Sequence, residues 1–522
     1  MLSGGKMRGY RAARRSGLVL LGSAGLLLAG CTIPPSPMTN TERAAEAAKD
    51  LSSAYANQEP LRGPLTLNEA FARALKYNLD ARVKMMQETL AQDDLDLSRL
   101  DMLPKALVSA GYLTRDQVDA SSSTSVLTGR QSLEPSTSSD INRHTADLTL
   151  SWNILDFGVS YLAARQAGNR QLVAQEERRK VVERLIQDVR RAFWRAASAQ
   201  RLSRQVRSAV RAAEAALPAA RKVESEALRS PIDSLRYQKL LLDLLRQLEA
   251  IERDLASAKT ELASLINLPP GQHFTVAAPG DARLGLGPAP MHIRDMERVA
   301  LILNPDVRTM SYQGRISVDE SRKQLLKLLP GISVSYNPSY NSNSYLYHNY
   351  WAAGTALISG YLNNLLKAPY QIEQAKDQEL LATERRKAVS VAVLAKLHIA
   401  YDEYLATARE YRWSSELARV DERLYQQIAN RAAGDTGVQS ALERVSAQVS
   451  AVNSALQSYQ SYADAQAALG RLYDTMGLDP VAKGETTLSV KALTHAVSKT
   501  IRDWRKANPK SLVMAAHDAS AK

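Results

Sequence analysis

Two stretches of this chain alternate apolar and polar residues with a period of two. In the clearer stretch, residues 145–152, polar residues separate the apolar positions Ala146, Leu148, Leu150 and Trp152. The same alternation follows Pro330, where Ile332, Val334 and Tyr336 are separated by serines. This period predicts β-strands with one apolar and one polar face. We therefore predict two β-hairpins, over residues 103–158 and 329–362.

Most of the remaining chain has helical periodicity. Residues 159–222 predict one helix of roughly 95 Å at 1.5 Å per residue, and the chain reverses at residues 229–231. The returning segment repeats leucine in every heptad, at Leu241, Leu248, Leu255 and Leu262. A second helix from about residue 371 reverses near residues 434–437 and returns with apolar residues at 3/4 spacing. These heptads predict coiled-coil helices.

The chain is built from two repeats. The segment 78–82 recurs at 304–308, and Leu103-Pro104 recurs as Leu329-Pro330, so these two matches have the same offset in the numbering. After the hairpins, residues 166–178 recur at 374–386, which is a smaller offset. The first hairpin is therefore the longer one, and its excess lies in the Ser/Thr-rich stretch 117–139. A fixed order and spacing of this kind indicates internal duplication.

The predicted domains follow from this duplication. The first repeat covers residues 65–270 and the second covers residues 291–480. A Pro/Gly-rich linker, residues 271–290, joins them, and residues 481–522 form a basic tail without a clear pattern. Thr66 and Glu69 have the spacing of a helix capping box at the start of the first repeat.

The N-terminus has the pattern of an export signal. A basic segment precedes an apolar run at residues 17–28, which is too short to span a bilayer comfortably. Residues 28–30 (Leu-Ala-Gly) then precede Cys31, which resembles a bacterial lipoprotein cleavage box. We predict a signal peptide over residues 1–30, a lipidated Cys31, and a tether over residues 31–64. An ordinary signal peptide beside an incidental cysteine is the alternative.

Composition argues against several classes of function. The single cysteine excludes an internal disulfide, and the seven histidines form no pair at metal-ligand spacing. No phosphate loop, dinucleotide fingerprint or nucleophile elbow occurs. We therefore expect no enzymatic activity, no cofactor and no metal. Five of the 13 net positive charges lie in the basic segment before the first apolar run, and the remaining +8 is spread along helical faces, which does not favour nucleic acid as a partner.

Four strands with one apolar and one polar face suit a barrel that meets lipid outside and water inside. Four strands cannot close alone, because small barrels need about eight, so the strand number predicts an oligomer. The second hairpin is rich in aromatic residues, which fit a girdle at the membrane interface; a core cluster is the alternative. These girdle candidates are Tyr336, Tyr340, Tyr345, Tyr347, Tyr350 and Trp351.

The lipoprotein box, the two repeats and residues 152–158 (Trp-Asn-Ile-Leu-Asp-Phe-Gly) together resemble the TolC-like outer-membrane efflux family. The resemblance covers residues 65–480. It implies a mainly α fold with a small β part, in which three chains share a 12-stranded outer-membrane β-barrel that continues into a periplasmic α-helical barrel. It also implies two partners, a periplasmic adaptor and an inner-membrane pump driven by protons or ATP. The second turn, residues 360–366, departs from the family's glycine-containing pattern.

The resemblance also implies a gate at the periplasmic tip, where acidic residues form rings around the threefold axis. Matching the reversals places Glu443, Asp435 and Asp233 there; the alternative is that all three are solvated tip residues. The overall prediction is the exit duct of a tripartite exporter or type I secretion system in the outer membrane of a Gram-negative bacterium. A coiled-coil envelope scaffold that forms no channel is the alternative, although a scaffold has no use for amphipathic strands.

Overall fold

The computed structural model describes residues 35–132, 134–226, 230–277, 285–286, 291–432, 438–479 and 488–506. The chain separates into two units, Met1–Asn57 and Gln58–Lys522. The first unit contains the helix α2 (Asn40–Ala54), which begins with a capping box between Thr39 and Glu42. This helix is exposed along its length, so it contributes nothing to a core.

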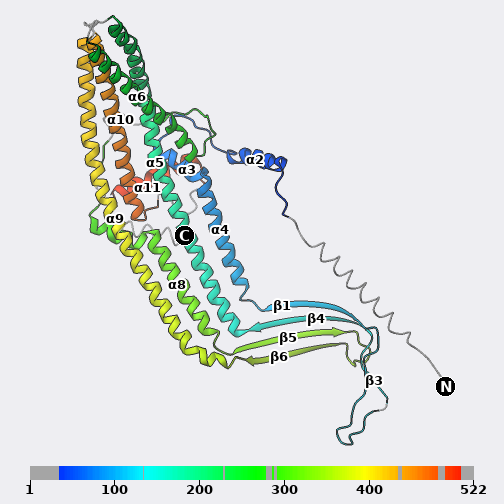
Figure 1. Cartoon of the computed structure of the whole chain (residues 1–522). Coiled ribbons are helices and arrows are strands. Elements are labelled where there is room, and N and C mark those ends of the chain that lie inside the picture. The colour runs from blue at the N-terminus through cyan, green and yellow to red at the C-terminus, as the bar shows by residue number, and fades with distance from the viewer. Residues whose placement is uncertain are drawn as a thin grey trace, which may run out of the picture. The chain divides into compact units, whose positions relative to one another are not determined.

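The second unit is mainly α-helical with a small antiparallel sheet, as predicted, and its elements occur twice (Figure 1). The helices α7 and α8 begin and end at the positions that correspond to those of α3 and α4. The difference in residue number is the same as for the sequence matches that precede the hairpins. Two short strands, β2 (Ala120–Ser121) and β3 (Ser136–Thr137), occupy the longer first hairpin, and the helix α11 (Val490–Lys506) follows the second half. The first half consists of α3 (Leu67–Tyr77), α4 (Leu79–Leu100), β1 (Lys105–Thr114), β4 (Asn142–Asn153), α5 (Ile154–Ser225) and α6 (Pro231–Leu265). The second consists of α7 (Ile293–Leu303), α8 (Pro305–Leu326), β5 (Gly331–Asn341), β6 (Tyr350–Ser359), α9 (Asn363–Ala432) and α10 (Val438–Thr475).

Two asparagines begin corresponding helices in the two halves. The side chain of Asn78 accepts the N–H of Ala81 at the start of α4 and donates to the carbonyl oxygen of Leu265 at 3.2 Å. Asn304 caps α8 in the same way and donates to the carbonyl oxygen of Thr475 at 2.9 Å. Each asparagine thus satisfies orphan groups at two helix ends. The start of each short helix is tied to the end of the coiled-coil helix of its own half.

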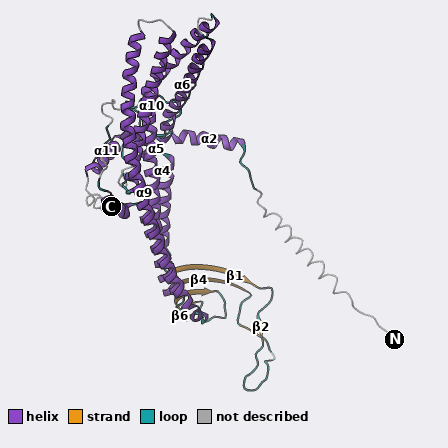
Figure 2. Ribbon diagram, turned by 60° about the vertical axis from the view of Figure 1, so that its left-hand side comes forward, coloured by secondary structure: helices purple, strands orange, loops and turns teal. Residues whose placement is uncertain are grey.

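The four main strands form one sheet in the order β1-β4-β5-β6, with every neighbouring pair antiparallel. The central pair joins the two halves, because Leu150 of β4 is opposite Tyr336 of β5. Figure 2 shows the strands together at one end of the long helices, with both helix reversals at the other. The sheet therefore continues directly into the helices on one side.

The long helices lie in the row α6, α5, α10, α9, each packed on the next. The core of the row is a coiled-coil seam that includes Leu241, Leu248, Val445 and Val449. Two further clusters lie nearer the sheet, one around Phe193 and one around Tyr404. The helix α11 packs on α3, and Trp504 contacts Tyr473 at 5.3 Å between ring centroids. No described helix combines the length and hydropathy needed to cross a membrane.

Candidate functional site

The sheet has one apolar face, which is largely exposed, and one polar face, whose residues from β4 and β5 are half-buried. Leu150, Trp152, Val334 and Tyr336 share the apolar face, and all four are exposed. The opposite face carries mainly serine, threonine and asparagine from β4 and β5. The four strands are 10 to 12 residues long, close to the roughly 9–11 residues with which a tilted strand crosses a bilayer. An exposed apolar surface of this kind needs a cover, which lipid can supply.

The aromatic residues of the second hairpin do not form one band on the sheet. The rings of Tyr340 and Tyr350 pair across the strands, with centroids 4.7 Å apart, and Tyr336 shares their apolar face. Tyr345 and Tyr347 lie in the turn between β5 and β6. Trp351 is opposite Ser339 and therefore lies on the polar face. Three of the six girdle candidates thus point to the apolar side of the sheet.

Both edges of the sheet are available for pairing. The strands β1 and β6 form the two ends of the strand order, and each pairs within the described chain on one side only. Their directions are opposite, so β6 of one copy could extend the sheet antiparallel to β1 of another. An exposed edge of ten residues is a template for such pairing.

The gate candidates that the structure describes lie at the two helix reversals. Glu443 of α10 forms an ion pair with Arg431 near the end of α9, and Asp233 lies 3.8 Å from Arg236. Both carboxylates are exposed. Asp435 and Cys31 lie outside the described residues. Within one chain, therefore, Glu443 and Asp233 each have a neighbouring arginine.

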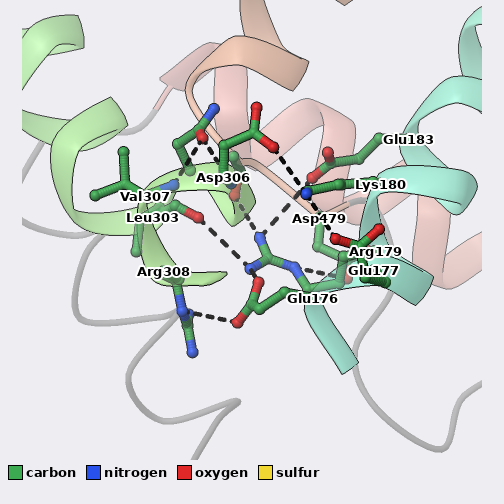
Figure 3. Close-up of polar contacts among 12 residues, drawn as sticks. Glu176, Glu177, Arg179, Lys180, Glu183, Leu303, Asp306, Val307, Arg308 and Asp479 are labelled. Carbon is green, nitrogen blue, oxygen red and sulfur yellow. Dashed lines mark hydrogen bonds and ion pairs between the residues drawn. The ribbon is translucent and has the colours of Figure 1, made fainter. Parts of the chain in front are cut away.

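An ionic cluster, which the sequence analysis missed, joins α5 to the second half (Figure 3). Arg179 and Glu176 at its centre are buried, whereas Lys180 and Asp306 are half-buried. Arg179 contacts Glu176 at 2.5 Å and donates to the carbonyl oxygen of Gly477 at 2.8 Å. Arg308 of α8 contacts the other oxygen of Glu176 at 2.8 Å, and Lys180 contacts Asp306 at 2.8 Å. The only sequence signal is the charged run at 176–180, which by itself is typical of a solvated helix face.

The backbone at Gly477 allows this cluster to form. Gly477 has a φ of 72°, and an added Cβ would lie 2.3 Å from the carbonyl oxygen of Leu303. Only glycine avoids both the backbone strain and the clash. The carbonyl groups of Leu303 and Gly477 therefore approach each other closely enough for Arg179 to reach both.

Burial and neighbouring charge set the protonation of this cluster. Burial alone would lower the pKa of Arg179, but Asp479, Glu176 and Glu183 outweigh it and raise that pKa. Burial raises the pKa of Glu183 well above its usual range, and the neighbouring Asp474 adds to the rise. Burial also raises the pKa of Asp474. The cluster therefore links the two halves and has two neighbouring carboxyl groups, Glu183 and Asp474, whose pKa values are raised. Within the described residues there is no group of three potential metal ligands among His, Cys, Asp and Glu.

Comparison with solved structures finds outer-membrane channels. The CmeC outer-membrane channel of Campylobacter jejuni matches at a TM-score of 0.55 and 14% identity, over 91% of this chain and 97% of that one. The open MtrE channel of Neisseria gonorrhoeae matches at 0.58 and 16%, over 79% and 88%. The outer-membrane protein VceC of Vibrio cholerae matches at 0.58 and 14%, over 79% and 96%. The chain has the fold of TolC-like outer-membrane channels. No protein-family model and no curated protein matches the sequence.

The two strand-to-helix junctions of this chain differ from each other. The helix α5 begins directly after β4, whereas three residues separate β6 from α9. The second junction exposes Tyr361, Leu362, Leu365 and Leu366. The second strand-to-helix turn therefore takes a different path from the first.

Proposed function

We propose that this protein is an outer-membrane channel that serves as the exit duct of a multi-component exporter. The observation that carries the proposal is the exposed apolar face of the sheet, on strands long enough to cross a bilayer, continuing into helices of 72 and 70 residues. The TolC-like fold supports the same conclusion. A channel of this build supplies a path and no energy, so the substrate must be delivered by another protein.

The assembled duct is a ring of copies in which β6 of one chain pairs with β1 of the next. By resemblance the ring has three chains and twelve strands, with outer-membrane lipid around the apolar face. A lipid on Cys31 anchors each chain. The polar stretch 117–139 extends from the side of the sheet opposite the helices and faces the outside of the cell. A periplasmic adaptor and an inner-membrane pump complete the exporter at the helical tip.

The constriction lies at that tip. Glu443, Asp435 and Asp233 surround the axis in the assembled ring and favour cations, because carboxylate rings select for positive charge. The pairing of Glu443 with Arg431 within one chain supports a closed state in which the ring charge is partly compensated.

The test of the duct is conductance. Full-length protein purified in detergent and added to a planar bilayer should produce discrete single-channel steps. An envelope scaffold would produce none, and the absence of steps in preparations that are folded by circular dichroism would overturn the proposal. The control is an outer-membrane channel of the same fold and known conductance in the same detergent.

A further inference from the structure

Equivalent positions in the two halves of the chain do not always carry the same charge. Arg195 of α5 contacts Glu261 of α6 at 2.5 Å. At the equivalent positions of the second half, Glu403 of α9 contacts Arg471 of α10, also at 2.5 Å. The ion pair is kept, but its polarity is reversed. A comparison of the halves, position by position, therefore shows where one of them has lost or gained a charge.

One ion pair of the first half has no counterpart in the second. Arg178 of α5 contacts Glu88 of α4, with 2.7 Å between Nε and Oε2, and the two side chains are 17% and 13% exposed. Arg386 of α9 corresponds to Arg178, because the segments that follow the two hairpins match in sequence. Gly314 of α8 corresponds to Glu88, because α4 and α8 begin and end at equivalent positions. The second half thus keeps the arginine and lacks the carboxylate.

A cavity of about 900 Å³ lies where the missing side chain would be. It is lined by residues of α5, α8 and α9, and both Gly314 and Arg386 are among them. Outside its own helix, the nearest atom to a Cβ added at Gly314 is the Cβ of Ala382, at the ordinary contact distance of 3.9 Å. No other side chain of the chain therefore takes the place that Glu88 has in the first half.

Two arginines of this cavity lack a carboxylate partner. Within the described residues, neither Arg386 nor Arg315 forms an ion pair. Arg315 stands where the first half has Thr89, and its guanidinium lies over the ring of Tyr312, 5.6 Å from the centroid. Both changes between the halves, the loss of an acid and the gain of a base, make this position more positive.

The remaining charges of the cavity do not compensate for these two arginines. Arg165 and Arg322 share the Oδ1 of Asp319, at 3.3 Å and 3.7 Å. Asp319 is 1% exposed, and its Oδ2 has no hydrogen-bond partner. Glu379 also lines the cavity, but it lies about 10 Å along α9 from Arg386. Four arginines thus face two carboxylates in one cavity.

We propose that this cavity binds a soluble oxyanion, a phosphate or carboxylate group of a small molecule, at the position that the Glu88 carboxylate occupies in the first half. The guanidinium groups of Arg386 and Arg315 hold the anion, because their planar geometry suits both kinds of group. The cavity has the size of a pocket for a small organic molecule. The inference goes beyond the proposed duct, and binding at this site does not depend on conductance.

Depth favours a soluble molecule over a membrane lipid as the source of the oxyanion. In the proposed placement the sheet crosses the membrane, and Gly314 lies about 18 Å from the end of α8 that is next to the sheet. The polar headgroup layer on each side of a bilayer is only roughly 5–8 Å thick. A phospholipid headgroup therefore does not reach this position.

Titration with inorganic phosphate tests the site. Full-length protein in a phosphate-free detergent, at constant ionic strength, should bind phosphate saturably in a calorimeter, with one site per chain. Arg386→Gln should weaken this binding at least tenfold. Arg385→Gln is the matched control, because Arg385 is exposed on the same turn of α9 and does not line the cavity. Binding that is not saturable, or equal weakening in the two variants, would overturn the site.

Restoring the missing carboxylate gives the sharper test. Gly314→Glu should abolish phosphate binding and leave the thermal midpoint unchanged or higher, because the chain then supplies the partner of Arg386 itself. Gly314→Ala adds only a Cβ and should still bind. Native affinity in Gly314→Glu would place the phosphate elsewhere and overturn the proposal.

Native mass spectrometry separates the two sources of the anion. A phospholipid retained on the purified native protein but lost from Gly314→Glu would overturn the soluble source. Native protein that conducts but binds no phosphate would keep the duct and exclude the site.

Discussion

Arg179 and Gly477 lie 298 positions apart in the chain, yet the guanidinium of the first donates to the carbonyl oxygen of the second at 2.8 Å. The same side chain contacts Glu176 and reaches the carbonyl oxygen of Leu303 at 3.5 Å. One buried cation thus joins α5 of the first half to the α7–α8 junction and to the end of α10. These contacts make it a structural link between the repeats.

Removal of this cation should destabilise the protein strongly. We expect Arg179→Met to lower the free energy of unfolding by about 3–5 kcal/mol, because it leaves buried carboxylates without their partner. Tryptophan fluorescence during thermal unfolding in detergent measures the change. The matched control is Lys387→Met, at the corresponding but exposed position of α9, for which a change below about 0.5 kcal/mol is expected. Equal losses in the two variants would show that the buried cluster contributes no special stability.

The protonation of Glu183 should make stability depend on pH. Because its pKa is raised in the folded protein, the folded state binds more protons than the unfolded state above pH 4.5, and stability falls as the pH rises through the raised value. Glu183→Gln removes this penalty while keeping the shape of the side chain. We expect the variant to be more stable than native protein at pH 8, and the difference to shrink toward pH 5.

Thermal midpoints measured from pH 5 to pH 8 check this expectation. Arg179, Asp474 and Asp479 are the charged groups that act on Glu183, and all three stay in place in the variant. Glu384→Gln, on the exposed surface of α9, is the control, and its thermal midpoint should change with pH in the same way as that of native protein. A Glu183→Gln curve that also runs parallel would contradict the assignment.

The parts of this fold that were visible in the sequence are those set by near neighbours. The alternation from Ala146 to Trp152 and the leucine heptads depend on periods of two and seven, so they identify strands and coiled-coil helices directly. The face occupied by Trp351 could not be predicted in this way. It depends on the pairing of Tyr340 with Tyr350 across the turn, and a shift of one residue exchanges the faces.

The buried cluster was missed for a related reason. The charged run around Arg179 has the composition of a solvated helix, and its burial depends on α8 and α10, which are distant in sequence. The helix α11 was also missed. Its residue Trp504 lies in the basic C-terminal segment, and only the packing against Tyr473 shows that the described part of this segment, α11, joins the core.

The gate residues should control conductance. We expect Glu443→Ala with Asp435→Ala to raise single-channel conductance and to weaken both cation preference and block by divalent ions, because it removes negative charge from the constriction. Arg431→Ala removes the cationic partner of Glu443 instead and should strengthen cation preference. Conductance, reversal potential and block that are unchanged in the double variant would place the constriction elsewhere.

A lipid on Cys31 should anchor the protein to the membrane but should not be needed for its assembly. Mass spectrometry of the mature chain should show an acylated N-terminal Cys31. Cys31→Ser should lose the lipid and still assemble, because the sheet supplies its own apolar face. An unmodified thiol in the mature native chain would contradict the lipidation, and loss of assembly in Cys31→Ser would show that the lipid has a structural role.

The reversed ion pairs of the two halves bear on how a duplicated chain avoids folding incorrectly. In the native pairing Arg195 contacts Glu261 and Glu403 contacts Arg471. If the two coiled-coil hairpins exchanged their returning helices, arginine would face arginine and glutamate would face glutamate. We expect Glu403→Arg with Arg471→Glu to keep the native pair but to lower the yield of refolded protein relative to native chain, and equal yields would contradict this. Reversed polarity gives each outgoing helix a preference for its own return helix, which limits misassembly between homologous halves.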